Sequence, residues 1–187
     1  MRKAKLILCV TILFSMLTGC STKEETNNHT NIQLLLSNEN NFRLELLEII
    51  HEYRVILQLI VDDQERENIE YLEGRIDGFL SRNNQTIYST LNQDNINKTT
   101  LDAIVRDELQ KPLSRFISLM FNSLTEIKNI GIDKLDDSYI KYYDSVLSLL
   151  EVFDHAPSNL FTDENSSKSK EILTAIHSII ERYEGNH

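Results

Sequence analysis

The chain has 187 residues, of which 41% are hydrophobic and 26% charged, a composition that indicates one folded domain and excludes the disordered and fibrous classes. Only 5 Gly and 2 Pro leave little material for the turns of a many-stranded sheet, so long helices are favoured. The net charge of −10 opposes nonspecific nucleic-acid binding, and no nucleic-acid partner is expected.

The first part of the chain has the pattern of an export signal. Arg2, Lys3 and Lys5 form a short cationic start, and residues 6–17 are an uncharged apolar run. A membrane-spanning helix needs about 20 apolar residues, so this run is too short to span a bilayer.

The run ends in a tetrapeptide that resembles the lipobox of bacterial lipoproteins: Leu17, Thr18, Gly19 and Cys20. The resemblance is confined to the first twenty residues. It implies that residues 1–19 are a signal peptide removed by cleavage and that the Cys20 thiol carries a diacylglycerol group. It also implies that this lipid anchors the protein at the extracytoplasmic face of the cell membrane.

Cleavage and lipidation would change both the cysteine content and the charge. Cys9 lies in the removed segment and Cys20 carries the lipid, so no thiol remains for a disulfide or for thiolate catalysis. Loss of Arg2, Lys3 and Lys5 moves the net charge from −10 to −13. We therefore expect anionic headgroups to repel the domain rather than hold it flat on the lipid.

The mature chain divides into a tether and a domain. Residues 21–31 contain no apolar side chain and predict, together with the lipidated Cys20, a flexible tether over 20–31. From Ile32 onward, apolar residues recur every three or four positions, which predicts a single all-helical domain over 32–187.

Two apolar stripes open this domain. The second is about half a turn out of phase with the first, which indicates either a break between them or one long helix that changes its buried face. The break is favoured, because Asp62 followed by Glu65 resembles a helix N-cap with an acid in the first turn. The first stripe is Phe42, Leu46, Ile49, Tyr53, Ile56 and Ile60, and the second is Ile69, Leu72, Ile76, Phe79 and Leu80.

The middle of the chain predicts one short and one long helical segment. Residues 87–91 predict one or two helical turns, and a longer apolar stripe begins near Thr99. Pro112 predicts a kink or a new helix with the proline in its first turn. The stripe then continues to Gly131, a residue that favours a helix C-terminus.

Two further helices complete the pattern. Asp136 or Asp137 starts one that stops before Pro157, and Ser166 or Ser167 caps the last. The sequence therefore predicts an all-α fold, a helical bundle of about five to six helices after the N-terminal tether.

The best metal-binding pattern is a weak one. Glu48 and His51 have the i, i+3 spacing with which a carboxylate and an imidazole ligate one ion in di-iron bundles. Those bundles use the pair twice, and no second Glu-x-x-His occurs in this chain. A surface or half-buried histidine is the preferred interpretation, and we expect no metal or other cofactor.

Two features suggest contacts with other proteins. Gly74 and Gly78 form a Gly-x-x-x-Gly spacing, which indicates local close packing, helix weakness or a dimer contact. Tyr142 points away from the Tyr143 stripe, so it is a candidate interface residue or a tyrosine at the core edge with a wet hydroxyl.

No nucleophile elbow, phosphate-binding loop or dinucleotide fingerprint occurs, and we expect no enzymatic activity. The preferred hypothesis is a membrane-anchored binding or accessory module for an envelope protein. The alternative is a bundle that binds a metal or a small ligand around Glu48 and His51. The oligomeric state is left open.

Overall fold

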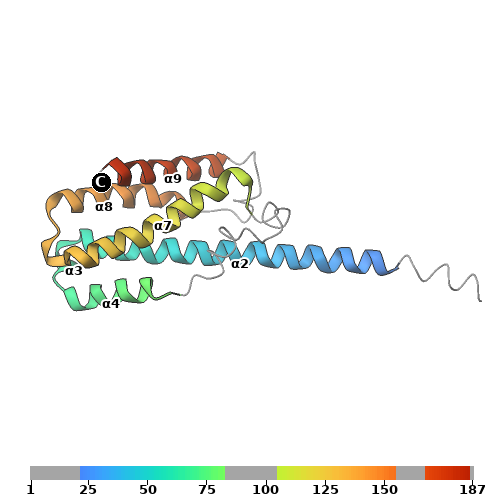
Figure 1. Cartoon of the computed structure of the whole chain (residues 1–187), viewed down its shortest axis with the longest axis horizontal. Coiled ribbons are helices and arrows are strands. Elements are labelled where there is room, and N and C mark those ends of the chain that lie inside the picture. The colour runs from blue at the N-terminus through green and yellow to red at the C-terminus, as the bar shows by residue number, and fades with distance from the viewer. Residues whose placement is uncertain (1–21, 83–104, 155–166, 186–187) are drawn as a thin grey trace, which may run out of the picture. The chain divides into compact units, whose positions relative to one another are not determined.

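The computed structural model describes the backbone of residues 22–82, 105–154 and 167–185, and side chains from residue 40 onward (Figure 1). Every element in these ranges is helical and none is a strand, which confirms the all-α prediction. The elements are α2 (Thr22–Val61), α3 (Asp63–Arg66), α4 (Ile69–Leu80), α7 (Asp107–Ile130), η1 (Ile132–Lys134), α8 (Asp137–Leu150), η2 (Glu151–Phe153) and α9 (Ser167–Gly185).

The start of α2 differs from the expected tether. Residues 22–31 are drawn as helix, although their composition predicts an irregular chain. Once a helix is nucleated, each further residue adds a hydrogen bond without a new nucleus, so a polar stretch can continue a neighbouring helix. The chain separates into one compact unit up to Asn38 and another from Glu39, and the second unit contains the helical domain.

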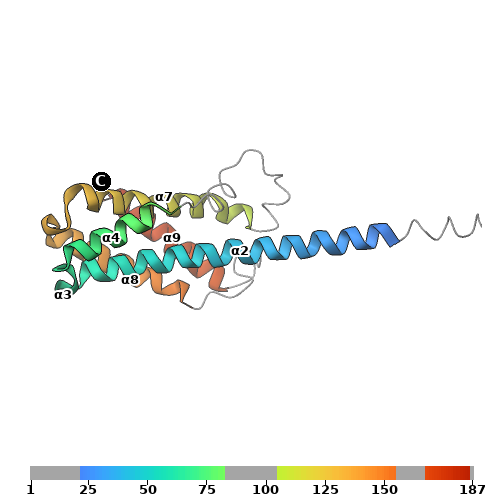
Figure 2. The same ribbon diagram turned by 90° about the horizontal axis from the view of Figure 1, so that it is seen from below.

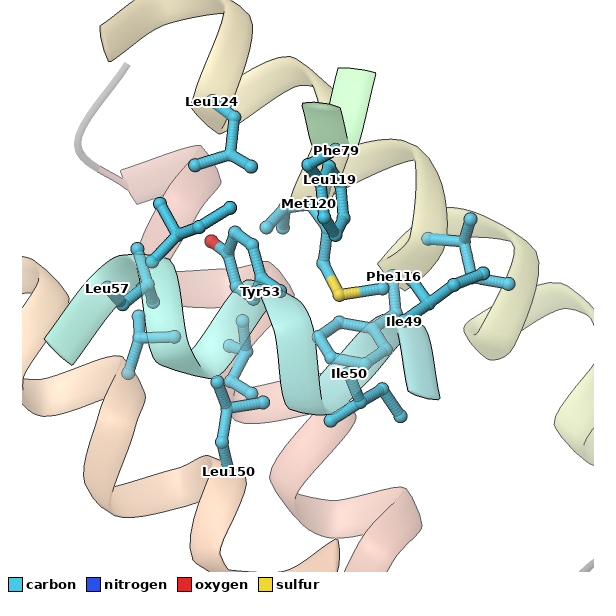
Figure 3. Packing of buried hydrophobic residues seen from close by; sticks show 14 of the residues in the cluster. Ile49, Ile50, Tyr53, Leu57, Phe79, Phe116, Leu119, Met120, Leu124 and Leu150 are labelled. Carbon is cyan, nitrogen blue, oxygen red and sulfur yellow. The ribbon is translucent and has the colours of Figure 1, made fainter. Parts of the chain in front are cut away.

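The second half of α2 forms the centre of the core. All six residues of the first predicted stripe are buried, and Leu46, Tyr53, Ile56 and Ile60 have no exposed surface. Figure 3 shows Tyr53 among side chains of α4, α7 and α8 and of its own helix, α2. The labelled neighbours are Ile49, Ile50, Leu57, Phe79, Phe116, Leu119, Met120, Leu124 and Leu150.

The remaining helices pack around this core. Helix α9 lies against both α7 and α8, and α4 lies against α7 (Figures 1 and 2). Aromatic contacts add to this packing: the Phe79 ring of α4 lies 4.9 Å from the Phe121 ring of α7, and the Phe116 ring of α7 stacks at 6.0 Å on the Phe153 ring of η2. Helix α9 buries four isoleucines on one side, Ile172, Ile176, Ile179 and Ile180.

The predicted break after the first stripe is confirmed. Helix α2 ends at Val61, and the Asp62 carboxylate accepts hydrogen bonds from the backbone N–H groups of Gln64 and Glu65. Asn68 then caps α4 through Tyr71 N–H. The second stripe is buried at Leu72, Ile76 and Phe79, whereas Ile69 at the first position of α4 is 37% exposed.

Two later helix boundaries also lie where the sequence predicts them. Gly131 ends α7 with φ at +93°, a conformation that L side chains rarely adopt. Asp136 caps α8 and accepts from the backbone N–H groups of Ser138 and Tyr139. These hydrogen bonds, with the Ser138 hydroxyl contributing most, lower the pKa of the Asp136 carboxyl.

Helix α7 continues through Pro112, so of the two predicted alternatives, a kink or a new helix, the new helix is wrong. It begins at Asp107, so Pro112 lies inside the helix in its second turn rather than in the first turn of a new helix. A proline there leaves only the Glu108 carbonyl without its helical donor. The helix start predicted near Thr99, the segment 87–91 and the cap at Ser166 lie outside the described residues.

Candidate functional site

The core contains a polar pair that involves the central helix. The Tyr53 hydroxyl lies 2.9 Å from the Ser123 hydroxyl of α7, and both side chains have no exposed surface. Ser123 in turn donates to the Met120 carbonyl at 3.0 Å. Burial is the main cause that raises the pKa of the Tyr53 phenol, which therefore stays protonated.

A carboxylate lies one helical turn beyond Ser123. Glu126 accepts a hydrogen bond from Tyr139 of α8 at 3.3 Å and another from Tyr183 of α9 at 3.4 Å. Desolvation first, and then the Glu126 charge, raise the pKa of both phenols. Both phenols therefore remain donors, and Glu126 connects α7 to the two helices that follow it.

Tyr142, the predicted interface residue, lies at the edge of this cluster. Its ring packs edge-on against Tyr143 at 5.0 Å, and its hydroxyl oxygen is buried with no hydrogen-bond partner in the described part of the chain. The hydroxyl is therefore neither wet nor presented to a partner. Helix α9 packs against α8, and such contacts between helices do not enter the projection of α8 alone. The interface role of Tyr142 stays a prediction, and its placement gives that role no support.

The metal candidates are already next to cations. The Glu48 carboxylate accepts from Arg82 at 3.2 Å, and His51 lines a small depression with Arg54, which forms an ion pair with Asp154. A neighbouring guanidinium opposes the approach of a second cation. Within the side chains described, no three His, Cys, Asp or Glu residues group as a set of metal ligands.

An open depression in the described part of the domain lies between α8, η2 and α9. It has a volume of about 580 Å³, and it is lined by Leu149, Val152 and Ala175 together with the charged side chains Glu151, Lys168 and Glu171. The last two side chains form an ion pair at 3.2 Å. Apolar and charged groups both line this open groove, and such a lining fits surface side chains of a protein better than an enclosed small molecule.

The residues that resemble a lipobox lie outside the described part of the chain; they are Leu17, Thr18, Gly19 and Cys20. In the parts of the chain that are described, no helix is both long and apolar enough to cross a membrane.

Sequence reasoning did not find Glu126 or the Tyr53–Ser123 pair. The two members of that pair are 70 positions apart, and Glu126 and Tyr183 are 57 apart. The sequence did contain one indication of the buried hydroxyl pair. Ser123 lies between Met120 and Leu124 on the apolar side of α7, and a buried serine needs a hydrogen-bond partner.

Comparison with protein-family models, with curated proteins and with solved structures finds no match to this chain.

Proposed function

We propose that this chain is an extracytoplasmic lipoprotein, anchored to the cell membrane through diacylglycerol on Cys20, whose helical domain binds an envelope protein. The observation that carries the proposal is the N-terminal sequence. A cationic start, a short apolar run and the tetrapeptide ending in Cys20 occur together and in the order that lipid attachment requires. Two long acyl chains hold a domain stably at a bilayer, whereas one gives marginal binding.

The surface of the domain supports a role in binding without catalysis. Its core is filled by apolar side chains, and the polar pair inside it, Tyr53 and Ser123, is satisfied by its own hydrogen bond and by the bond from Ser123 to the Met120 carbonyl. The open groove between α8 and α9 leaves apolar and charged groups accessible on the outside. These properties suit a module that offers surfaces to another protein.

The anchor is tested by substituting each cysteine in turn and following the protein in its host. Cells are fed an alkyne fatty acid, and label and membrane fractionation are measured for wild type, Cys20→Ser and Cys9→Ser. We expect Cys20→Ser to lose the label and to keep its signal segment, while the matched Cys9→Ser variant behaves as wild type. Equal labelling of the Cys20→Ser protein would refute the anchor.

The binding role is tested by crosslinking in cells, followed by affinity capture from detergent-extracted membranes. A specific envelope protein captured with wild type and lost with Cys20→Ser is the expected result, because the tether places the domain beside its partner. A folded and abundant domain that captures no protein would contradict the binding role. Metal and small-ligand analysis of the purified chain would then test the alternative centred on Glu48 and His51.

A further inference from the structure

Another depression lies where the first half of α8 meets the end of α9, the two helices that run side by side in Figure 1. It has a volume of about 460 Å³, and none of the described residues that line it is acidic. Two of them carry a positive charge, Lys141 from α8 and Arg182 from α9. The lining consists of Ser138, Lys141, Tyr142, Ser145, Arg182 and Gly185.

Neither cation has a counter-charge. Within the described residues, Lys141 and Arg182 form no ion pair, and the Arg182 guanidinium donates one long hydrogen bond, to the Ser145 carbonyl at 3.4 Å. The chain has 29 acidic residues against 19 Lys and Arg, so an arginine without a carboxylate is unexpected. Arg43 is the other arginine without an ion pair in the described chain. The arginines that do pair with carboxylates are Arg54, Arg66, Arg75, Arg82, Arg106 and Arg115.

The carboxylates of α8 do not neutralise this pair of cations. Asp136 is occupied as the cap of the helix, where it accepts hydrogen bonds from the Ser138 hydroxyl and from backbone N–H groups. Asp137 and Asp144 lie about one helical turn to either side of Lys141, and neither lines the depression. The positive charge at the depression is therefore left without a partner on α8.

The carboxylates of α9 line a different depression. Glu181 and Glu184 lie there with Lys111 and Arg115 of α7, and Arg115 forms an ion pair with Glu184. In that depression the domain balances its own charge. At the depression around Lys141 it does not.

Tyr142 indicates where the Arg182 guanidinium lies. Desolvation raises the pKa of the Tyr142 phenol, and the Arg182 charge opposes that rise, so the guanidinium lies close to the phenol. Because the phenol stays protonated, it offers the guanidinium no negative charge. The guanidinium therefore lies at the depression with no anion of the described chain beside it.

We propose that this depression binds a phosphate group, with Lys141 and Arg182 as the anchoring charges. A guanidinium can donate two parallel hydrogen bonds to one phosphate, and an ammonium adds a compact point charge from a second direction. The two serine hydroxyls of the lining already donate to Asp136 and to the Tyr142 carbonyl, so recognition depends on charge. The proposal goes beyond the lipid anchor and the envelope partner and depends on neither.

The test is calorimetric titration of the purified full chain in nonionic micelles. The probe is inorganic pyrophosphate, and sodium chloride of equal ionic strength is the control for unspecific charge effects. We expect saturable binding whose affinity falls as salt rises. Pyrophosphate that shows no saturable binding in the millimolar range would overturn the proposal.

Variants of the two cations then locate the binding. Lys141→Gln with Arg182→Gln should weaken pyrophosphate binding by at least about tenfold, because both charge-assisted contacts are lost. Arg182→Lys should retain more affinity than Arg182→Gln, since it keeps the charge and loses only the fork of donors. Both residues are exposed, so each variant should keep the urea midpoint of wild type.

The depression between α7 and α9 provides the matched control. Lys111→Gln with Arg115→Gln removes the same charge from a lining that contains its own carboxylates. We expect this change to leave the pyrophosphate affinity within about twofold, because screening makes distant charges weak contributors. An equal loss of affinity from the two double variants would show an effect of net charge alone and would overturn the proposal.

Competition against pyrophosphate distinguishes two sources of the phosphate group. Competition by soluble glycerol phosphate would identify a free phosphate ester, and competition only by micelles that contain phosphatidylglycerol would identify a lipid headgroup. The net charge of the domain favours the soluble ester, because an anionic lipid surface repels the rest of the domain. Competition by neither would overturn the proposal.

Two results separate this proposal from the proposed function. Suppose that the envelope partner is lost from Lys141→Gln with Arg182→Gln while wild type does not bind pyrophosphate. The two cations would then belong to a protein interface, and the phosphate site would be wrong. A Cys20→Ser protein that keeps its membrane label would contradict the anchor and leave these titrations unchanged.

Discussion

Removing the hydroxyl of Ser123 should destabilise the domain more than removing the hydroxyl of Tyr53, although each change deletes the same hydrogen bond. A serine hydroxyl has one proton, and Ser123 donates it to the Met120 carbonyl, so the Tyr53 phenol is the donor in the 2.9 Å bond. Tyr53→Phe therefore leaves Ser123 with its donor satisfied and loses about 1 kcal/mol, the net contribution of one hydrogen bond. Ser123→Ala leaves a fully buried phenol without a partner and costs about 1–3 kcal/mol.

The assay is urea unfolding of the full chain, followed by far-UV circular dichroism, with the two single variants and the double variant. Once Ser123 is Ala, Tyr53→Phe removes the unpaired hydroxyl, so the double variant should be no less stable than Ser123→Ala alone. Ser118→Ala is the matched control, because that hydroxyl donates within α7 to Ser114 and has no partner on another helix. The reasoning is refuted if Ser123→Ala costs no more than Tyr53→Phe at an unchanged m-value.

Three further substitutions test the packing, the turn and the helix cap. Phe116→Ala should cost about 3–5 kcal/mol in urea unfolding, because the ring is fully buried and stacked on a second ring, whereas Leu44→Ala, 57% exposed, should change stability by about 0.5 kcal/mol or less. Gly131→Ala should destabilise the domain by about 1–3 kcal/mol, because φ at this position is positive. Gly78→Ala should stabilise it by about 0.5–1 kcal/mol, because an added Cβ atom meets no other atom there. A loss of stability in Gly78→Ala would contradict the open space around that residue. Asp136→Ala should lower the urea midpoint of unfolding at pH 7, because the substitution removes the cap of α8. The pKa of the Asp136 carboxyl in the folded protein lies below its ordinary value of 3.8, so the stability advantage of wild type is complete above pH 3.8 and shrinks as the pH falls through the folded pKa. A stability difference that grows on acidification would contradict the cap.

The apolar periodicity was sufficient to predict the helices that form the core. The stripe from Phe42 to Ile60 is buried in full, and the caps at Asp62, Gly131 and Asp136 lie where local side-chain chemistry predicts them. These features depend on residues within one or two helical turns of each other. The helical backbone of residues 22–31 was not predictable in this way, because composition measures the gain from burial and not the ease of extending an existing helix.

The candidate site depends on contacts that no local pattern contains. The phenols of Tyr139 in α8 and Tyr183 in α9 both reach Glu126 of α7 because α9 packs against α7 and α8. Tyr142 is the clearest case, since the projection of a single helix places it outside the apolar stripe, whereas its hydroxyl is buried in the folded domain. Exposure of Tyr71 likewise follows from the placement of a whole helix, and its sequence neighbours do not distinguish it from a core tyrosine.

The position of α9 has a consequence for the order in which the chain acquires its structure. This last described helix supplies Ile172, Ile176, Ile179 and Ile180 to the interior and lies against α7 and α8. During synthesis, the apolar sides of those two helices are exposed until α9 has left the ribosome, since chains emerge from the N-terminal end. A chain cut short before α9 should therefore leave the apolar sides of α7 and α8 exposed to solvent and be prone to aggregate.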